Sequence, residues 1–202
     1  YDAFTNIQDG ITAVASEGTV NVAAGTYTEV GQIIIDRNLS IVGENKINTI
    51  IKPDMDYSDG WFWVDSEVAF NLSKVTLDGT GQVITEAIIH QGSGTINDNR
   101  FTGIKDNSGS YWNEGTAIAV DSTENVDITN NEFTEIGMNG ILADYNTGTI
   151  SGNTYIGKGA GNWVDYFILS EYGSNVSISN NIISNNIGVD EDDGFTSAAI
   201  AV

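Results

Sequence analysis

The sequence predicts an all-β protein, a parallel β-helix (solenoid) in which short strands stack as successive coils behind one N-terminal helix. Two observations carry this prediction: a strand motif that recurs along the chain, and an amphipathic segment that precedes it. The chain has 202 residues, of which 40% are hydrophobic, enough for one packed domain. We expect that single domain to cover residues 1–202, with a capping helix at residues 4–17 and coils at residues 18–202.

The recurring motif is a hexapeptide with an apolar residue, two variable residues, Asn, one variable residue and another apolar residue. Full copies ("INDNRF", "ITNNEF", "ISGNTY", "ISNNII") start 22 to 32 residues apart, and a weaker copy, "FNLSKV", starts at Phe70. This spacing suits coils of about three short strands with loops of variable length. Coils stack about 4.8 Å apart, so one Asn per coil would form a hydrogen-bonded ladder at a turn. The expected ladder consists of Asn99, Asn131, Asn153 and Asn181.

The N-terminal segment "FTNIQDGITAVASEG" has the pattern of a short amphipathic helix. Phe4, Ile7 and Ile11 fall on one helical face, and Thr5 and Gln8 have the spacing of a capping box. A helix here would cover the open first coil, whose strand edges would otherwise remain unpaired. At the other end, "SAAIAV" reads as an unfinished strand, so we expect further domains of the same parent chain.

The helix, "VNVAAGTYTE", "LSIVGEN" and the Ile-x-x-Asn repeats together resemble the pectin-lyase-like superfamily and its surface β-helix repeat proteins, over essentially the whole chain. The resemblance implies a right-handed, single-stranded parallel β-helix. Surface proteins, adhesins, polysaccharide lyases and glycoside hydrolases share these repeats, so the resemblance does not select an activity.

The amino-acid composition limits which classes of partner this protein is expected to bind. The 28 acidic residues against 7 Lys and Arg give a formal net charge of -21, which disfavours nucleic acid and anionic membranes and attracts cations. The sequence has no Cys, and no apolar run is long enough to span a bilayer. We expect no nucleic-acid partner, no membrane insertion, and an extracellular or cell-surface location.

One strand of each coil carries a candidate metal site. Aligning "EAIIHQ", "TAIAVD", "NGILAD", "YFILSE" and "SAAIAV" points Ile88 and its equivalents inward, and places polar side chains in an outward column. Calcium takes 6 to 8 oxygen ligands and could bind this column, and the resemblance places calcium and substrate on the same strand face. The alternative is that these residues are only solvated strand ends. The candidate calcium ligands are Asp121, Asp144 and Glu171, with Gln91 in the same column.

Aromatic residues gather near the same face. Flat rings stack on the apolar surfaces of sugars, so we expect a polysaccharide or cell-surface glycan as ligand. The alternative is that the tryptophans pack as lids over the coil. The candidate ligand-binding residues are Tyr111, Trp112, Tyr145, Trp163, Tyr166 and Tyr172.

The single histidine, His90, is expected in the core, and the acidic segment "DEDDG" is expected to be a solvated loop.

A catalytic role has weaker support. A polysaccharide lyase needs a base, and only Lys105 and Lys158 begin loops beside the acidic column. A glycoside hydrolase needs two carboxyl groups, for which Asp121 and Asp144 are candidates. We therefore predict a secreted or cell-surface module with a structural, adhesive or carbohydrate-binding role. The alternative is a lyase or hydrolase acting on acidic polysaccharide with calcium, and surface acidity as salt adaptation is a third interpretation.

Overall fold

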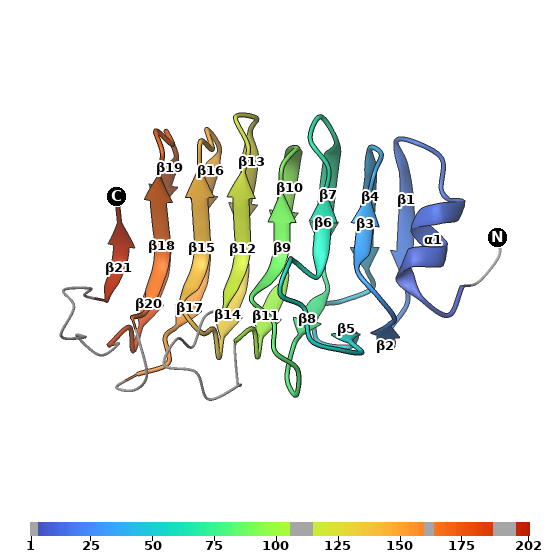
Figure 1. The fold of residues 1–202 in the computed structure, drawn as a ribbon, viewed down its shortest axis with the longest axis horizontal. Helices are drawn as coiled ribbons and strands as arrows, with labels where there is room; N and C mark the ends of the chain where they lie inside the picture. The colour runs from blue at the N-terminus through green and yellow to red at the C-terminus, as the bar shows by residue number, and fades with distance from the viewer. Residues whose placement is uncertain (1–3, 106–114, 160–163, 188–196) are drawn as a thin grey trace.

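The computed structural model describes residues 4–105, 115–159, 164–187 and 197–202, and these form a parallel β-helix (Figure 1). Each coil contributes one strand to each of three sheets, which we call A, B and C, and every registered strand pair is parallel. Figure 1 shows sheet C facing the viewer, with the N-terminal helix at one end of the stack and strand β21 at the other. The structure thus confirms the predicted fold class.

The strands of the three sheets alternate along the chain in the order A, B, C. Sheet A consists of β1 (Gly18–Val22), β4 (Leu39–Gly43), β7 (Ala69–Ser73), β10 (Ser93–Asn97), β13 (Val126–Thr129), β16 (Thr149–Ser151) and β19 (Ser177–Ser179). Sheet B consists of β2 (Gly25–Glu29), β5 (Thr49–Pro53), β8 (Thr76–Asp78), β11 (Arg100–Thr102), β14 (Glu132–Thr134), β17 (Thr154–Ile156) and β20 (Ile182–Ser184). Sheet C consists of β3 (Ile33–Ile35), β6 (Phe62–Val64), β9 (Glu86–His90), β12 (Thr116–Asp121), β15 (Asn139–Asp144), β18 (Tyr166–Glu171) and β21 (Ala198–Ala201).

The core is a set of side-chain columns that run through the coils. Alternate residues of each strand point inward, so residues in register stack on their equivalents in the next coil. Ile88, Ile118, Ile141 and Ile168 form one such column and are fully buried, as predicted. Ile200 continues the column in the last coil and is 43% exposed.

The predicted asparagine ladder is present at the turn between sheets A and B. The Asn131 amide donates to the Asn153 side-chain oxygen (3.1 Å) and to the Ile96 carbonyl (2.8 Å). Its own oxygen accepts from the backbone N–H (2.9 Å) and the amide (3.1 Å) of Asn99. Asn153 repeats these contacts with Asn181 and Ile128. Each interior amide is therefore fully bonded without water.

The weaker copy of the motif is out of register by two residues, so its predicted alignment was wrong. Leu72, not Phe70, pairs with Ile96, and Ser73 pairs with Asn97. The ladder position is held by Val75, whose backbone N–H donates to the Asn99 side-chain oxygen at 3.1 Å. A two-residue shift leaves every side chain on the same face, so apolar alternation alone could not detect it.

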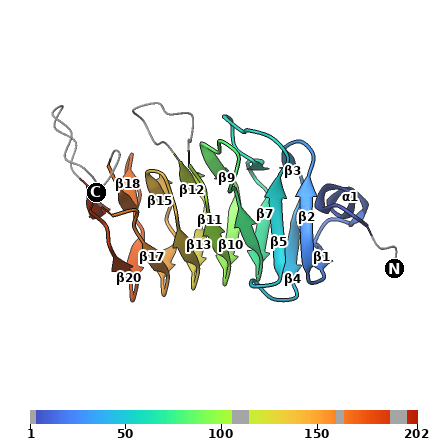
Figure 2. The same ribbon diagram turned by 90° about the horizontal axis from the view of Figure 1, so that it is seen from below.

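The capping helix α1 (Ile7–Ala13) is shorter than predicted but lies across the first coil (Figures 1 and 2). Its N-cap is Asn6, whose side chain accepts from the Asp9 N–H at 2.7 Å, so the expected Thr5 capping box was wrong. The Gln8 side chain instead bonds the backbone of Ile34 on the first strand of sheet C. The helix thereby satisfies polar groups of an edge strand.

The helix start is also held by a residue far along the chain. The buried Glu29 carboxylate accepts from the N–H groups of Ile7 (2.8 Å) and Gln8 (3.3 Å), and burial raises its pKa.

None of the described helices is long and apolar enough to cross a membrane.

Candidate functional site

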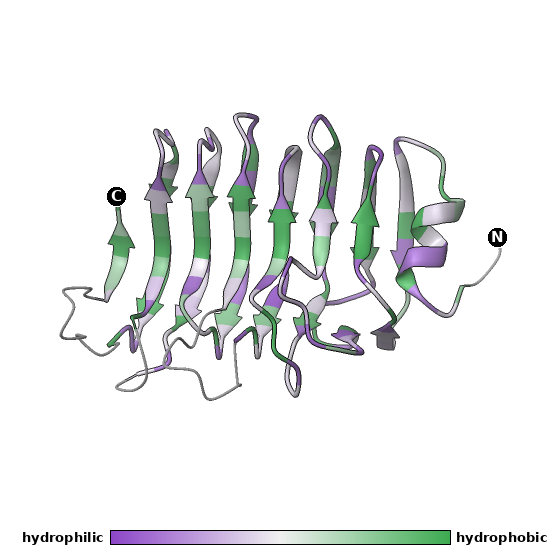
Figure 3. Ribbon diagram, in the orientation of Figure 1, coloured by the Kyte–Doolittle hydropathy of each residue, from purple (hydrophilic) through white to green (hydrophobic). Residues whose placement is uncertain are grey.

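The outer face of sheet C carries a continuous row of apolar side chains. Strand register joins one outward residue of each strand to the next, and all seven are only partly buried. Figure 3 shows apolar (green) segments on the strands of sheet C, where inward core residues and these outward residues alternate. The residues of this apolar row are Ile34, Trp63, Ile89, Ala119, Leu142, Leu169 and Ala201. Sequence reasoning missed it, although "TAIAVD", "NGILAD" and "YFILSE" each show an apolar or small residue two places before the acidic one.

A carboxylate row runs beside the apolar row. Asp121 pairs with Asp144, and Asp144 pairs with Glu171, so the structure brings together the three predicted metal ligands in register. Gln91 follows His90, the partner of Val120, and continues the row into the preceding coil. Calcium binding here stays a prediction, because the described residues include no group of three His, Cys, Asp or Glu side chains able to hold a metal ion.

Asp144 is the electrostatically strained member of the carboxylate row. Burial first, and then the negative charges of Glu171 and Asp121, raise its pKa. One carboxylate oxygen, Oδ1, is buried and has no hydrogen-bond partner. Within the described part of the chain, no Lys or Arg forms an ion pair with these three acids. The row therefore presents negative charge that the neighbouring side chains do not neutralise.

Two tyrosines stack immediately after the carboxylate row. Tyr145 and Tyr172 follow Asp144 and Glu171, and their ring centroids lie 5.9 Å apart with an interplanar angle of 26°. They are 46% and 65% exposed. Both residues have positive φ angles, 61° and 50°, a conformation that costs a non-glycine residue about 1 kcal/mol. The same backbone conformation recurs at other turns, as at Asp98 and Asn130, so the exposure of the two rings is the feature that suggests a ligand-binding role.

The other predicted aromatic residues do not join this pair. Tyr166 is partly buried at the opposite end of β18 from Glu171, and burial raises its pKa. Tyr111, Trp112 and Trp163 lie outside the described residues, as does the segment "DEDDG".

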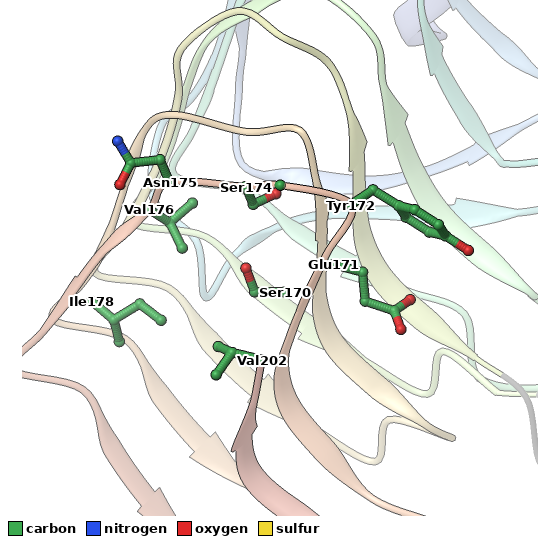
Figure 4. Close-up of a pocket in the computed structure, with 9 residues that line it drawn as sticks. Ser170, Glu171, Tyr172, Ser174, Asn175, Val176, Ile178 and Val202 are labelled. Atoms are coloured by element: carbon green, nitrogen blue, oxygen red, sulfur yellow. The ribbon is translucent and has the colours of Figure 1, made fainter.

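A depression of about 590 Å³ lies beside the last coil and was not predicted. Figure 4 shows Glu171 and Tyr172 projecting to one side of it, while Ser170, Ile178 and Val202 gather on the other. Val176 and Ile178 pack against the main core. The depression thus opens into the interior of the last coil, with Glu171 of the carboxylate row and Tyr172 at its edge, and no residue of the apolar row lines it.

The two candidate bases are both engaged. Lys105 forms an ion pair with Glu135 at 3.0 Å. The Lys158 ammonium group donates to the carbonyls of Gly137 and Val164 (2.8 Å for Val164), and burial lowers its pKa to about 8. Because Gly137 and Val164 precede β15 and β18, Lys158 ties together the segments that enter sheet C.

His90 is fully buried, as predicted, and its ring lies 6.0 Å from that of Phe70. Neither ring nitrogen forms a hydrogen bond of good geometry, although backbone groups of Phe70 and Gly92 lie close enough to favour the protonated ring slightly. Burial lowers its pKa to about 4, so the side chain is neutral at physiological pH.

Comparison with known proteins supports the fold. No protein-family model and no curated protein sequence matches the chain. Among solved structures, a pectin methylesterase point mutant in complex with a hexasaccharide aligns over 91% of this chain at a TM-score of 0.57 and 13% identity. This chain spans 63% of that protein's length. The chain therefore has the parallel β-helix fold of pectin-lyase-like proteins, which confirms the resemblance at the level of fold.

A second solved structure, ORF18 of Geobacillus virus E2, aligns over 91% of this chain and 58% of its own, with a TM-score of 0.25 and 13% identity.

Proposed function

We propose that this chain is a carbohydrate-binding β-helix module, secreted or displayed at a cell surface, that holds a glycan along the outer face of sheet C. The observation that carries the proposal is the pairing of two rows on that face. The apolar row and the carboxylate row advance together by one residue per coil, in the direction of the solenoid axis. A ligand that follows them must itself be a repeating polymer.

The chemistry of the two rows complements a sugar chain. Aliphatic and aromatic side chains cover the C–H faces of pyranose rings, and carboxylates accept hydrogen bonds from hydroxyl groups. Asp65 follows Val64, the partner of His90, and so occupies the position equivalent to Gln91 in the preceding coil. The Trp63 indole N–H donates to Asp65 at 3.0 Å and thereby connects the apolar row with that column. The exposed pair Tyr145 and Tyr172 adds a stacking platform at one end.

The scaffold is suited to such a ligand because it is already rigid. Each inner strand of sheet C is paired on both sides, so the rows need not become ordered on binding. Repetition also suits an adhesive role, since several weak contacts act together along one polymer. A hexasaccharide bound to the pectin methylesterase of the same fold is compatible with a glycan ligand here.

Glycan retention of aromatic variants tests the proposal. We expect the wild-type protein to be retarded in affinity gels that contain soluble polysaccharides, and Tyr145→Ala/Tyr172→Ala to lose that retardation. Because both side chains are exposed, thermal unfolding of the variant should change little. Phe4→Ala removes an exposed aromatic residue near α1 and serves as the matched control. Equal retardation of all three proteins, or of none, would contradict the proposal.

A catalytic alternative is favoured by one observation, the lowered pKa of Lys158, which suits a general base near neutral pH. In this reading the chain is a lyase or hydrolase of acidic polysaccharide, with calcium bridging the carboxylate row and the substrate. The base would first have to release two backbone carbonyls. Incubation with pectin, alginate and neutral glycans, with and without calcium, distinguishes the readings. Unsaturated uronates or new reducing ends that disappear in Lys158→Ala would establish the enzyme.

A further inference from the structure

We propose that the glycan held along sheet C is cationic, a β-linked polymer of amino sugars that carries free amino groups. This inference rests on the proposed function and names the ligand class of the same site. The surface in question is the apolar row, and the charge of the neighbouring carboxylate row selects its occupant.

The negative charge on the outer face of sheet C is the first reason to expect a cationic ligand. The described lysines that form ion pairs lie outside the sheet C rows: Lys46 pairs with Asp98 and Glu132, and Lys52 with Asp78. The face with the apolar row keeps its negative charge, in a chain whose formal net charge is -21. A uronate polymer would meet repulsion here, and a neutral glycan would gain only hydrogen bonds from its hydroxyl groups to the acids. A polymer with ammonium groups would gain charge-assisted hydrogen bonds, which are stronger.

The second step is the arrangement of that charge. Asp121, Asp144 and Glu171 lie in register on successive coils, and the described residues hold no three acidic or His side chains that converge on one ion. One carboxylate per coil, repeated about every 4.8 Å, suits a polymer whose positive charges recur at a whole number of coils. It suits a single multivalent ion less well. The unpartnered Oδ1 of Asp144 would gain a donor from such a ligand.

The third step distinguishes a sugar polymer from a basic peptide. An extended peptide advances about 3.3 Å per residue, with alternate side chains on opposite faces, so it falls out of step with the coils. Pyranose rings in an extended β-1,4-linked chain repeat at close to the coil spacing, so each ring can lie on one residue of the apolar row. Successive rings are turned over relative to one another, so every second amino group faces the carboxylate row and meets the acid of every second coil.

Titration calorimetry with β-1,4-linked hexasaccharides tests the inference. The ligands are the hexamers of glucosamine, N-acetylglucosamine and glucose, with oligolysine as the peptide probe. We expect the glucosamine hexamer to bind about tenfold tighter than the glucose hexamer, because two exposed ion pairs, with Asp121 and Glu171, together give about one factor of ten in Kd. This preference should shrink to about threefold in Asp121→Asn/Asp144→Asn, where Glu171 remains, and should fall with added salt.

A matched double variant controls for net charge. Glu67→Gln/Glu124→Gln removes two exposed carboxylates from turns outside the row and should keep the tenfold preference. Equal binding of the three hexamers would overturn this inference and leave the proposed function standing. Failure of all hexamers to bind would overturn both. Oligolysine binding as tightly as the glucosamine hexamer would also overturn the choice of a sugar polymer.

Discussion

Two columns of this solenoid have the same geometry and opposite electrostatics. The asparagine ladder and the carboxylate row both place one polar side chain at an equivalent position of successive coils. In the ladder, each amide donates to one neighbour and accepts from the other, so the column satisfies itself. In the carboxylate row, every member can only accept, and Asp144 keeps a buried oxygen without a partner.

The difference shows that stacking amplifies whatever a single position contributes. A repeated amide adds one more bonded pair with every coil, whereas a repeated carboxylate adds one more repulsion. The ladder is therefore explained by stability alone. The carboxylate row is not, and its chemistry is better accounted for by a ligand outside the protein.

The largest change in stability is expected when the asparagine ladder is interrupted at an interior position. Asn131→Ala removes two donated hydrogen bonds and strands the buried N–H groups of Asn99. Since the site is buried, we expect a loss of about 3 kcal/mol in the free energy of unfolding, measured by urea denaturation. The same change at Asn181, which is only partly buried, should cost less. Equal, small losses at both positions would show that the ladder is not cooperative.

His90 is a buried polar side chain that belongs to no ladder, so its effect on stability can be compared with that of the ladder asparagines. The pKa of His90 is lowered to about 4, whereas an unfolded histidine takes up its proton near 6.5. The unfolded state therefore binds the proton first, and stability is lost as pH falls from about 6.5 to about 4. That window corresponds to roughly 3 kcal/mol.

The matched variant is His90→Phe, which keeps a ring beside Phe70 and cannot be protonated. Urea denaturation at pH 7 and pH 4 should show a smaller drop in stability for the variant than for the wild type. Identical drops would mean that His90 does not titrate as the structure indicates.

Removing charge from the carboxylate row should stabilise the protein. The raised pKa of Asp144 means that the folded state holds this proton more tightly than the unfolded state. Its ionisation therefore lowers stability as pH rises through the acid range. We expect Asp144→Asn to be more stable than the wild type by about 0.5 kcal/mol at pH 7, and by less at pH 3 or in high salt. A less stable variant at pH 7 would give the carboxylate a structural role.

The smallest effect is expected at the exposed tyrosines. Tyr172→Gly removes one ring of the stacked pair and also relieves the positive φ angle of 50°. The gain from relaxed backbone and the loss of the stack should nearly cancel, leaving unfolding within about 0.5 kcal/mol of the wild type. A loss well above that value, seen by thermal denaturation, would mean that the pair supports the fold.

The fold could be predicted because its signal is repeated. One Asn per coil fixed the turn and, through it, the inward column that includes Ile118 and the outward position of Asp144. The ladder's first coil was misassigned because Val75 replaces the amide and only its backbone N–H contributes.

Other features are single contacts between residues far apart in the sequence. They could not be predicted, because no repeated motif indicates them. Glu29 caps a helix 21 and 22 residues earlier in the chain, and Lys158 joins two segments through backbone carbonyls. The residues of the apolar row are visible in the aligned strands. A single outward apolar residue is common, however, and indicates a binding surface only when the strand register shows that it recurs on neighbouring coils.

The central claim is that the carboxylate row serves a ligand at the expense of stability. One double variant, Asp121→Asn/Asp144→Asn, tests it directly when its free energy of unfolding and its Kd for the glucosamine hexamer are measured together. We expect opposite changes: a more stable protein that binds the hexamer about threefold more weakly. A variant that is less stable and binds the hexamer as tightly as the wild type would contradict it.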